Sequence, residues 1–411
     1  MNNAVIGQSG GPTSAINATL AGIIEGLLQG GKTEKIYGMR HGIEGFLNED
    51  LILLNDYFSS GSKEKLELLK STPAAALGSC RKKISDDATM EKIFSLFEKY
   101  KISYFFYIGG NDSMDSVYKL SEYAFKNKGR VRDVKIIGVP KTIDNDLMET
   151  DHTPGFGSAA KYIVSSMQEI MRDCSVYKTK AITIVEIMGR DAGWLAASSS
   201  LCKYLTGIGP EYIYLPEHVF DKEKFISDIS SKLSDDNVSY VVVAVSEGIK
   251  NKDNKYVGED EQSSVSDVFG HKYLSGTGKY LENLVRKRIG CKVRSIELNV
   301  LQRCASHIAS KTDIDESVKI GFASAQYALS DKGKSGMVAV YKRNCDGSEY
   351  SVSIDFVPAE NVANKIKYVP ETFINKEGNG ITEEGIKYLL PLIKGEIEIK
   401  YEHGVPVHFT F

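Results

Sequence analysis

Pro140-Lys141-Thr142-Ile143-Asp144-Asn145-Asp146 is the most informative stretch of this chain. It directly follows the apolar run VKIIGV at 134–139, which is typical of a buried parallel strand. An ammonium, a hydroxyl and two carboxylates therefore leave the carboxyl end of a strand, where open α/β sheets place their ligands. A lysine that attracts anions beside a carboxylate base indicates phosphoryl transfer to a hydroxyl. A simple polar turn is the alternative on this segment alone, because Asp and Asn are common in turns.

Composition and charge exclude several classes of function. The chain has 411 residues, 42% of them hydrophobic and 26% charged, which is ordinary for a globular protein of two or three domains. A net charge of −3 without a basic cluster gives no reason to expect a nucleic-acid partner. No apolar run is long enough to span a bilayer, and the amino terminus lacks the pattern of a secretion signal. Six widely spaced cysteines without a CxxC pair predict reduced thiols and a cytoplasmic location.

Short apolar strands alternate with helix-length amphipathic segments along most of the chain. This alternation predicts an α/β fold with doubly wound, mostly parallel sheets. The segment 250–268 is polar and predicts a long loop. The expected strands are 4–6, 104–108, 136–139, 181–187, 240–245, 337–341 and 350–356, the last two joined by a turn at 344–348. The expected helices are 14–28, 113–125, 156–171 and an Ala-rich helix that runs through Ser200.

Three further loops carry small residues that let backbone amides approach an anion. Two of them, Gly10-Gly11-Pro12-Thr13 and Gly109-Gly110-Asn111-Asp112-Ser113, each precede a predicted helix, whose amino end attracts phosphate. The third, Leu77-Gly78-Ser79-Cys80-Arg81, adds a cation that can bridge phosphate oxygens. The chain contains neither a Walker A pattern nor a GxGxxG motif followed by an acidic residue, so P-loop and nicotinamide-binding folds lose support.

The ordered set of loop motifs resembles the phosphofructokinase family, in particular its pyrophosphate-dependent branch. The resemblance runs from about residue 4 to about residue 342, and no single motif is as specific as the set. The motifs are Gly10-Gly11, Gly78–Arg81, Gly109–Ser113, Pro140–Asp146, Met188-Gly189-Arg190, Ser246-Glu247-Gly248 and Gln302-Arg303.

The resemblance implies two α/β domains with the active site in the cleft between them. The larger domain is expected over 1–155, completed by part of 311–411, and holds the loops that bind the phosphoryl donor. The smaller domain is expected over 156–310 and holds the residues that bind the sugar phosphate. The family also implies a homodimer or homotetramer, in which a neighbouring subunit often lends the arginine that matches Arg303.

The implied substrates are fructose 6-phosphate and pyrophosphate. Asp144 would take the proton from the 1-hydroxyl of the sugar, and Asp146 would support Asp144 or the metal. Arg190 would stabilise the transferring phosphoryl group. The implied sugar-phosphate site comprises Thr142, Asp144, Met188, Gly189, Arg190, Glu247 and Arg303. The implied pyrophosphate site comprises Gly11, Arg81, Gly110, Asp112 and Lys141.

Two residues distinguish pyrophosphate from ATP as the phosphoryl donor. ATP-dependent relatives usually carry glycine where this chain has Asp112 and Lys141. The Asp112 carboxylate would fill the space of a nucleotide α-phosphate and repel it. The Lys141 ammonium would instead meet the leaving phosphate of pyrophosphate. The resemblance also implies Mg²⁺, with Asp112 and Asn111 as its ligands, although many relatives have an aspartate at position 111.

Two alternatives stay open at this point. The first is an ATP-dependent phosphofructokinase that tolerates Asp112 and Lys141. The second, of another class, is a regulatory subunit that binds phosphosugars without catalysis. Some relatives lose the base or the arginine, but this chain keeps both Asp144 and Arg190. The main interpretation is therefore a reversible phosphotransferase of glycolysis and gluconeogenesis.

Overall fold

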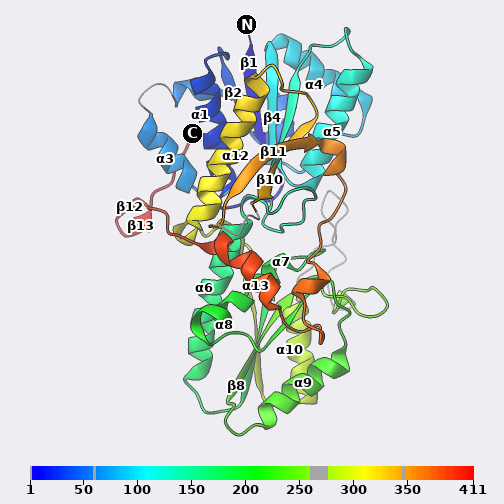
Figure 1. Cartoon of the computed structure of the whole chain (residues 1–411), viewed down its shortest axis with the longest axis vertical. Coiled ribbons are helices and arrows are strands. Elements are labelled where there is room, and N and C mark those ends of the chain that lie inside the picture. The colour runs from blue at the N-terminus through cyan, green and yellow to red at the C-terminus, as the bar shows by residue number, and fades with distance from the viewer. Residues whose placement is uncertain (1, 59–61, 260–275, 345–348) are drawn as a thin grey trace.

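The computed structural model describes residues 2–58, 62–259, 276–344 and 349–411 (Figure 1). The end of the predicted loop at 250–268, most of the predicted turn at 344–348 and Cys345 lie outside these residues. The described helices are α1 Ile16–Gly30, α2 Gly42–Leu47, α3 Lys63–Ser71, α4 Asp87–Lys99, α5 Asn111–Lys126, α6 Phe156–Ser175, α7 Trp194–Ser198, α8 Ser200–Thr206, α9 Lys222–Ser234, α10 Thr277–Arg288, α11 Leu301–Cys304, α12 Lys311–Leu329 and α13 Glu383–Leu389.

The larger sheet has seven strands in the order β11-β10-β5-β4-β1-β2-β3. Its inner pairs are parallel, and the edge strands β3 and β11 are antiparallel to their neighbours. The chain passes from β1 to β2 on one side and later to β4 on the other, so β1 and β4 flank a topological switch point, where α/β sheets bind ligands. The strands are β1 Asn3–Gln8, β2 Ile36–Met39, β3 Leu51–Leu53, β4 Ile102–Gly109, β5 Lys135–Pro140, β10 Met337–Arg343 and β11 Val352–Pro358.

Helices cover both faces of this sheet because its central strands are apolar on both sides. Strand β1 is buried along its whole length, and its alternate side chains join two different cores. One core packs against α1, α3 and α12, and the other packs against α2, α4 and α5. Helices α1 and α12 lie side by side (Figure 1), and glycine allows their close approach, since a Cβ on Gly22 would lie 2.1 Å from the carbonyl oxygen of Val318.

The smaller sheet has four parallel strands in the order β7-β8-β6-β9. Its strands are β6 Ala181–Ile187, β7 Tyr212–Tyr214, β8 Tyr240–Ser246 and β9 Lys292–Glu297. Helices α6, α7, α8 and α13 pack on one face, and α9 and α10 pack on the other. The prediction of doubly wound, mostly parallel sheets is therefore confirmed.

The carboxyl-terminal part of the chain packs against both sheets. After β11, residues 369–393 join the core formed by α6 and α7 of the smaller sheet. The chain then returns to the larger sheet through the short pair β12 Tyr401–Glu402 and β13 Val405–Pro406 (Figure 1). The ring of Phe411 packs on Tyr57 and Phe58. The predicted domain boundaries at residues 155 and 310 stay a prediction.

Three further expectations can be compared with the fold. The Ala-rich segment forms two short helices, α7 and α8, in place of one continuous helix through Ser200. The five cysteines within the described residues are free thiols, and three of them are buried. No helix in the part of the chain that the structure describes is long and apolar enough to cross a membrane. The predicted cytoplasmic location and oligomeric state stay predictions.

Candidate active site

The loops singled out in the sequence meet at one cavity of about 780 Å³. It is lined by segments that follow β1, β4 and β5 of the larger sheet and β6, β8 and β9 of the smaller one. Every predicted site residue except Gly189 lines this cavity: Gly11, Arg81, Gly110, Asn111, Asp112, Lys141, Thr142, Asp144, Asp146, Met188, Arg190, Glu247 and Arg303.

Asp144 lies in a tight turn directly after β5. The Thr142 hydroxyl donates a hydrogen bond to Asp144 Oδ2 (3.2 Å), and the Asp144 N–H donates to Thr142 Oγ1 (3.1 Å). Burial raises the pKa of Asp144, while the bond from Thr142 and the cations Arg190 and Lys141 act in the opposite direction. A half-buried carboxylate with a raised pKa is a better proton acceptor than a fully solvated one, so Asp144 has the chemistry of a general base.

Lys141 is almost fully buried, with 2% of its surface exposed. Its Nζ donates a hydrogen bond to the carbonyl oxygen of Gly11 at 2.6 Å, which aims the ammonium at the glycine loop after β1. Burial lowers the pKa of Lys141 to about 8, and the cations Arg303 and Arg81 act in the same direction, against Asp144. Lys141, Arg303 and Arg81 all line the cavity, and three cations in one cavity suit a polyanion.

Gly189 shapes the loop after β6 but does not line the cavity. Its φ of 137° belongs to a region that favours glycine, and its N–H donates to Glu247 Oε1 at 3.3 Å. The Ser246 hydroxyl in turn donates to the Gly189 carbonyl. Gly189 therefore positions its neighbours Met188 and Arg190, which line the cavity, without lining it itself.

Glu247 and Arg190 are two of the polar side chains that the smaller sheet contributes opposite the Asp144 loop. Burial raises the pKa of Glu247 to about 8, and the nearby carboxylates of Asp144 and Glu186 add to this effect. The Arg190 guanidinium is held by a hydrogen bond from its Nε to Asp191 Oδ2 at 3.2 Å. Arg190 also lowers the pKa of Asp144, so the two groups act on each other across the cavity.

Arg303 lies nearer the glycine loop than its predicted role implies. A Cβ on Gly11 would lie 3.4 Å from Arg303 Nη1, and Arg303 lowers the pKa of Lys141. Its Nε is buried without a hydrogen-bond partner among the described residues. The guanidinium thus reaches the end of the cavity where the pyrophosphate residues were expected. Its contact with the 6-phosphate of the sugar stays a prediction.

Comparison with known proteins decides the family. The family model described as phosphofructokinase matches residues 3–327. The chain belongs to the phosphofructokinase family.

Its relatives carry names of the pyrophosphate-dependent branch. A protein from Xanthomonas campestris pv. campestris, named pyrophosphate--fructose 6-phosphate 1-phosphotransferase, is 39% identical over 99% of this chain and 96% of its own length. One of the same name from Halomonas elongata is 37% identical over 98% and 95%. A crystal structure of pyrophosphate-dependent phosphofructokinase from Nitrosospira multiformis superposes with a TM-score of 0.86 and 36% identity, covering 98% and 95%. The family and the branch that the loop motifs resemble are confirmed.

Oxygen ligands for a metal ion are present in this phosphofructokinase cavity, although they form no dedicated cage. Asp112, Asp144 and Asp146 all line it, and carboxylates are the ligands that Mg²⁺ prefers. Within the described ranges no group of three or more His, Cys, Asp or Glu side chains could hold a metal ion by itself. Since Mg²⁺ at phosphate sites takes one or two carboxylates plus substrate phosphates, the residues fit a metal that arrives with the donor.

Of the two predicted metal ligands, Asn111 is the less available. Its Oδ1 accepts a hydrogen bond from the Asn364 N–H at 2.5 Å, and its Nδ2 donates to the Lys365 carbonyl at 2.6 Å. Asp112 Oδ1 lies 3.8 Å from Lys83 Nζ, a distance that leaves the carboxylate able to turn toward the cavity. Asp112 is therefore the better candidate, and both assignments stay predictions.

The cavity also contains residues that the sequence did not single out. Asp191 directly follows Arg190. Gln302 belongs to the Gln302-Arg303 motif but was given no role, and its Oε1 accepts a hydrogen bond from the Met188 N–H at 3.2 Å. Asn364 and Ile366 come from a segment beyond the motifs and have no recognisable signal. The lining residues that belong to the motifs but were given no role are Gly10, Pro12, Thr13, Ser113, Ile143 and Gln302. The lining residues outside the motifs are Ser9, Glu186, Asp191, Glu297, Asn299, Val300, Asn364 and Ile366.

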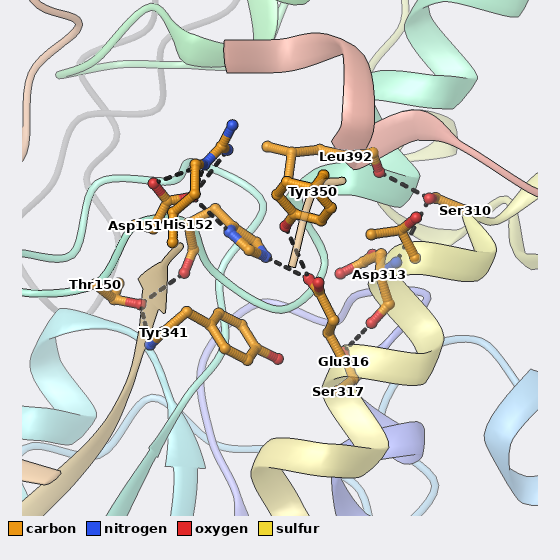
Figure 2. Close-up of polar contacts among 12 residues, drawn as sticks. Thr150, Asp151, His152, Ser310, Asp313, Glu316, Ser317, Tyr341, Tyr350 and Leu392 are labelled. Atoms are coloured by element: carbon orange, nitrogen blue, oxygen red, sulfur yellow. Dashed lines mark hydrogen bonds and ion pairs between the residues drawn. The ribbon is translucent and has the colours of Figure 1, made fainter. Parts of the chain in front are cut away.

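A buried polar cluster anchors the far end of the loop that carries Asp144. Figure 2 shows His152 between Asp151 and Glu316, with its ring nitrogens 2.9 Å and 2.7 Å from their carboxylate oxygens. Burial alone would lower the pKa of His152, but the two carboxylates outweigh it and raise this pKa. Asp151 also pairs with Arg343 of β10 at 2.9 Å. The cluster thus ties the loop to α12 and β10.

This cluster predicts a pH-dependent contribution to stability. We expect His152→Gln to lower the free energy of unfolding by about 3–5 kcal/mol at pH 6, because it takes the charged partner from the buried carboxylate of Glu316. Since the folded-state pKa of His152 is raised, the stabilisation is full below the unfolded-state pKa and is lost as the pH rises through the folded-state pKa. Denaturant titrations at pH 6 and pH 9 should therefore show a larger deficit at pH 6. An equal deficit at both pH values would contradict a charged His152.

Proposed function

We propose that this chain transfers a phosphoryl group from pyrophosphate to the 1-hydroxyl of fructose 6-phosphate, giving fructose 1,6-bisphosphate and phosphate. The observation that carries the proposal is the placement of Lys141 and Asp144 on one buried loop, with the ammonium held at Gly11 by a 2.6 Å hydrogen bond. A cation for the leaving phosphate and a base for the attacking hydroxyl thereby share one cavity. The names of the relatives from Xanthomonas campestris and Halomonas elongata support the same reaction.

The reaction follows from the positions of these charges. The 1-hydroxyl gives its proton to Asp144 as its oxygen bonds to the nearer phosphorus of pyrophosphate. The bridging P–O bond breaks, and phosphate leaves toward Lys141 and Arg81. Arg190 stabilises the charge on the equatorial oxygens of the transferring group. Mg²⁺, when bound with pyrophosphate through Asp112, supplies further neutralisation of the phosphate charge.

The sugar site completes the proposal. Glu247 accepts hydrogen bonds from sugar hydroxyls, and Arg303 binds the 6-phosphate. Thr142 holds Asp144 in place. The carboxyl of Asp146 lies close enough for the two groups to affect each other's protonation, so it supports Asp144 as the proton acceptor. In the reverse direction protonated Asp144 returns its proton to the departing sugar oxygen, so the same residues serve both directions. Catalysis in glycolysis or gluconeogenesis is consistent with this reversibility.

An assay of the products tests this proposal. With fructose 6-phosphate, pyrophosphate and Mg²⁺, we expect fructose 1,6-bisphosphate and inorganic phosphate in equal amounts, measured by phosphorus NMR. With fructose 1,6-bisphosphate and phosphate, we expect the reverse reaction. Formation of phosphate without bisphosphate would mean hydrolysis and would contradict the proposal. A regulatory subunit without catalysis would form neither product.

A further inference from the structure

A carboxyl-terminal segment, residues 364–369, lies along the wall of the cavity beyond the region matched by the family model. We call it the strap. Its first two residues bind Asn111 at the start of α5, through the Asn364 N–H and the Lys365 carbonyl. Its Val369 N–H donates to Glu217 Oε1 at 2.9 Å, and Glu217 also accepts from the Gly193 N–H just before α7. The strap thus joins a loop of the larger sheet to a loop of the smaller one.

Lys367 occupies the middle of the strap, and its backbone bonds one segment after β5 and another after β6. Its N–H donates to the Asp146 carbonyl at 2.8 Å, and its own carbonyl accepts from Trp194 Nε1 at 2.9 Å. Asp146 follows Asp144 by two residues, and Trp194 opens the helix that follows the Arg190 loop. One strap residue is therefore bonded to the loop of the proposed base and to α7, the helix that directly follows the loop of the proposed phosphoryl-binding arginine.

The side-chain nitrogen of Lys367 donates hydrogen bonds to three acceptors in the loop after β5. Nζ donates to Asn145 Oδ1 (3.2 Å), the Thr150 carbonyl (3.1 Å) and the Asp151 carbonyl (2.7 Å). These three acceptors use all three N–H donors of an ammonium. Asn145 is fully buried and has a left-handed φ of 54°, a conformation that residues other than glycine seldom adopt unless the surroundings impose it.

The two ends of this loop have other anchors. Its start is fixed by Lys141, whose N–H donates to the Gly109 carbonyl. Its far end is fixed by the Asp151, His152 and Glu316 cluster (Figure 2). Between these ends, Lys367 is the cation that binds backbone carbonyls of residues 150 and 151 and the side chain of residue 145 together.

We propose that Lys367 is a positioning residue, which fixes the base loop (residues 141–151) against the Arg190 wall so that Asp144 and Arg190 keep their mutual placement. Lys367 is absent from the residues that line the cavity, so it acts through the loop and does not itself meet substrate. This inference rests on the proposed function and adds to it a residue that no motif marks. Loss of the ammonium would free Asn145 and the carbonyls at 150 and 151, and the carboxylate of Asp144 would lose its fixed orientation.

The test compares Lys367→Met with Lys376→Met in the full chain, since Lys376 is an exposed lysine of the same carboxyl-terminal region. A displaced base slows the chemical step but leaves the contacts that bind the substrates intact. We therefore expect Lys367→Met to lower kcat about a hundredfold, with each KM within about threefold of wild type. Hydrogen exchange should accelerate in residues 141–151 and stay unchanged in β4 and α10. Lys376→Met should match wild type in both measurements.

A second variant retains the backbone of the turn. Asn145→Gly tolerates the left-handed φ but deletes the acceptor of Lys367, so kcat should fall while KM is preserved, by less than in Lys367→Met. Unchanged kcat in an active enzyme would overturn the inference, and so would loss of exchange protection throughout both sheets, which would make Lys367 a general stability residue. If wild type forms no fructose 1,6-bisphosphate, the proposed function fails, and exchange in residues 141–151 still decides whether Lys367 fixes the loop.

Discussion

Asp144→Asn is expected to lower kcat by about 10³-fold or more, with fructose 6-phosphate affinity retained within a few-fold. The amide has the shape of the carboxylate and can keep its contact with Thr142, but it cannot accept the proton of the 1-hydroxyl. Burial has already raised the pKa of Asp144, so its basicity is the property that the substitution removes. Initial rates in both directions give kcat, and calorimetric titration with fructose 6-phosphate gives the affinity.

The matched control for this substitution is Asp331→Asn, which makes the same chemical change at an exposed position. Its kcat and affinity should equal those of wild type. Turnover by Asp144→Asn within tenfold of wild type would remove Asp144 as the base. A regulatory subunit without catalysis would show no turnover in either the wild type or the variant.

The double variant Asp112→Gly, Lys141→Gly is expected to lower kcat/KM for pyrophosphate by about 10²–10³-fold. Lys141 is buried beside the glycine loop, and its ammonium is the positive charge that the proposal assigns to the leaving phosphate. Removal of Asp112 takes away the carboxylate that would repel a nucleotide α-phosphate. We therefore expect kcat/KM for ATP to be maintained or to rise while that for pyrophosphate collapses.

Single variants assign this effect to its residue. Lys141→Gly alone should account for most of the loss with pyrophosphate, and Asp112→Gly alone should chiefly change the response to ATP. Thermal unfolding of each variant checks that the loss is not one of folding. If the double variant kept its activity with pyrophosphate, an ATP-dependent enzyme that tolerates both residues would be the better account.

Much of the site was predictable because parallel sheets place their ligand-binding and catalytic residues at the carboxyl ends of the strands. The loops after β1, β4 and β5 meet because these strands are neighbours around the switch point of the larger sheet. The short motifs fix which side chains those loops carry, and Lys141, Asp144 and Arg190 accordingly line one cavity. Gly189 does not line the cavity, but its φ and its bond to Glu247 shape the loop that does, and its predicted contact with the sugar phosphate stays a prediction.

Features set by distant backbone contacts could not be predicted. The strap binds Asn111 through the backbone of residues 364 and 365, and such contacts leave no side-chain pattern to recognise. The continuous Ala-rich helix expected through Ser200 is interrupted for a local reason. The hydroxyls of Ser198, Ser199 and Ser200 each donate to a carbonyl three residues earlier, which competes with regular helix geometry.

The choice of pyrophosphate as donor is the central claim, and one comparison tests it most directly. Initial rates with pyrophosphate and with ATP, at matched free Mg²⁺ and saturating fructose 6-phosphate, give kcat/KM for each donor. The buried ammonium of Lys141 and the carboxylate of Asp112 predict a higher kcat/KM with pyrophosphate. A higher kcat/KM with ATP would contradict the account.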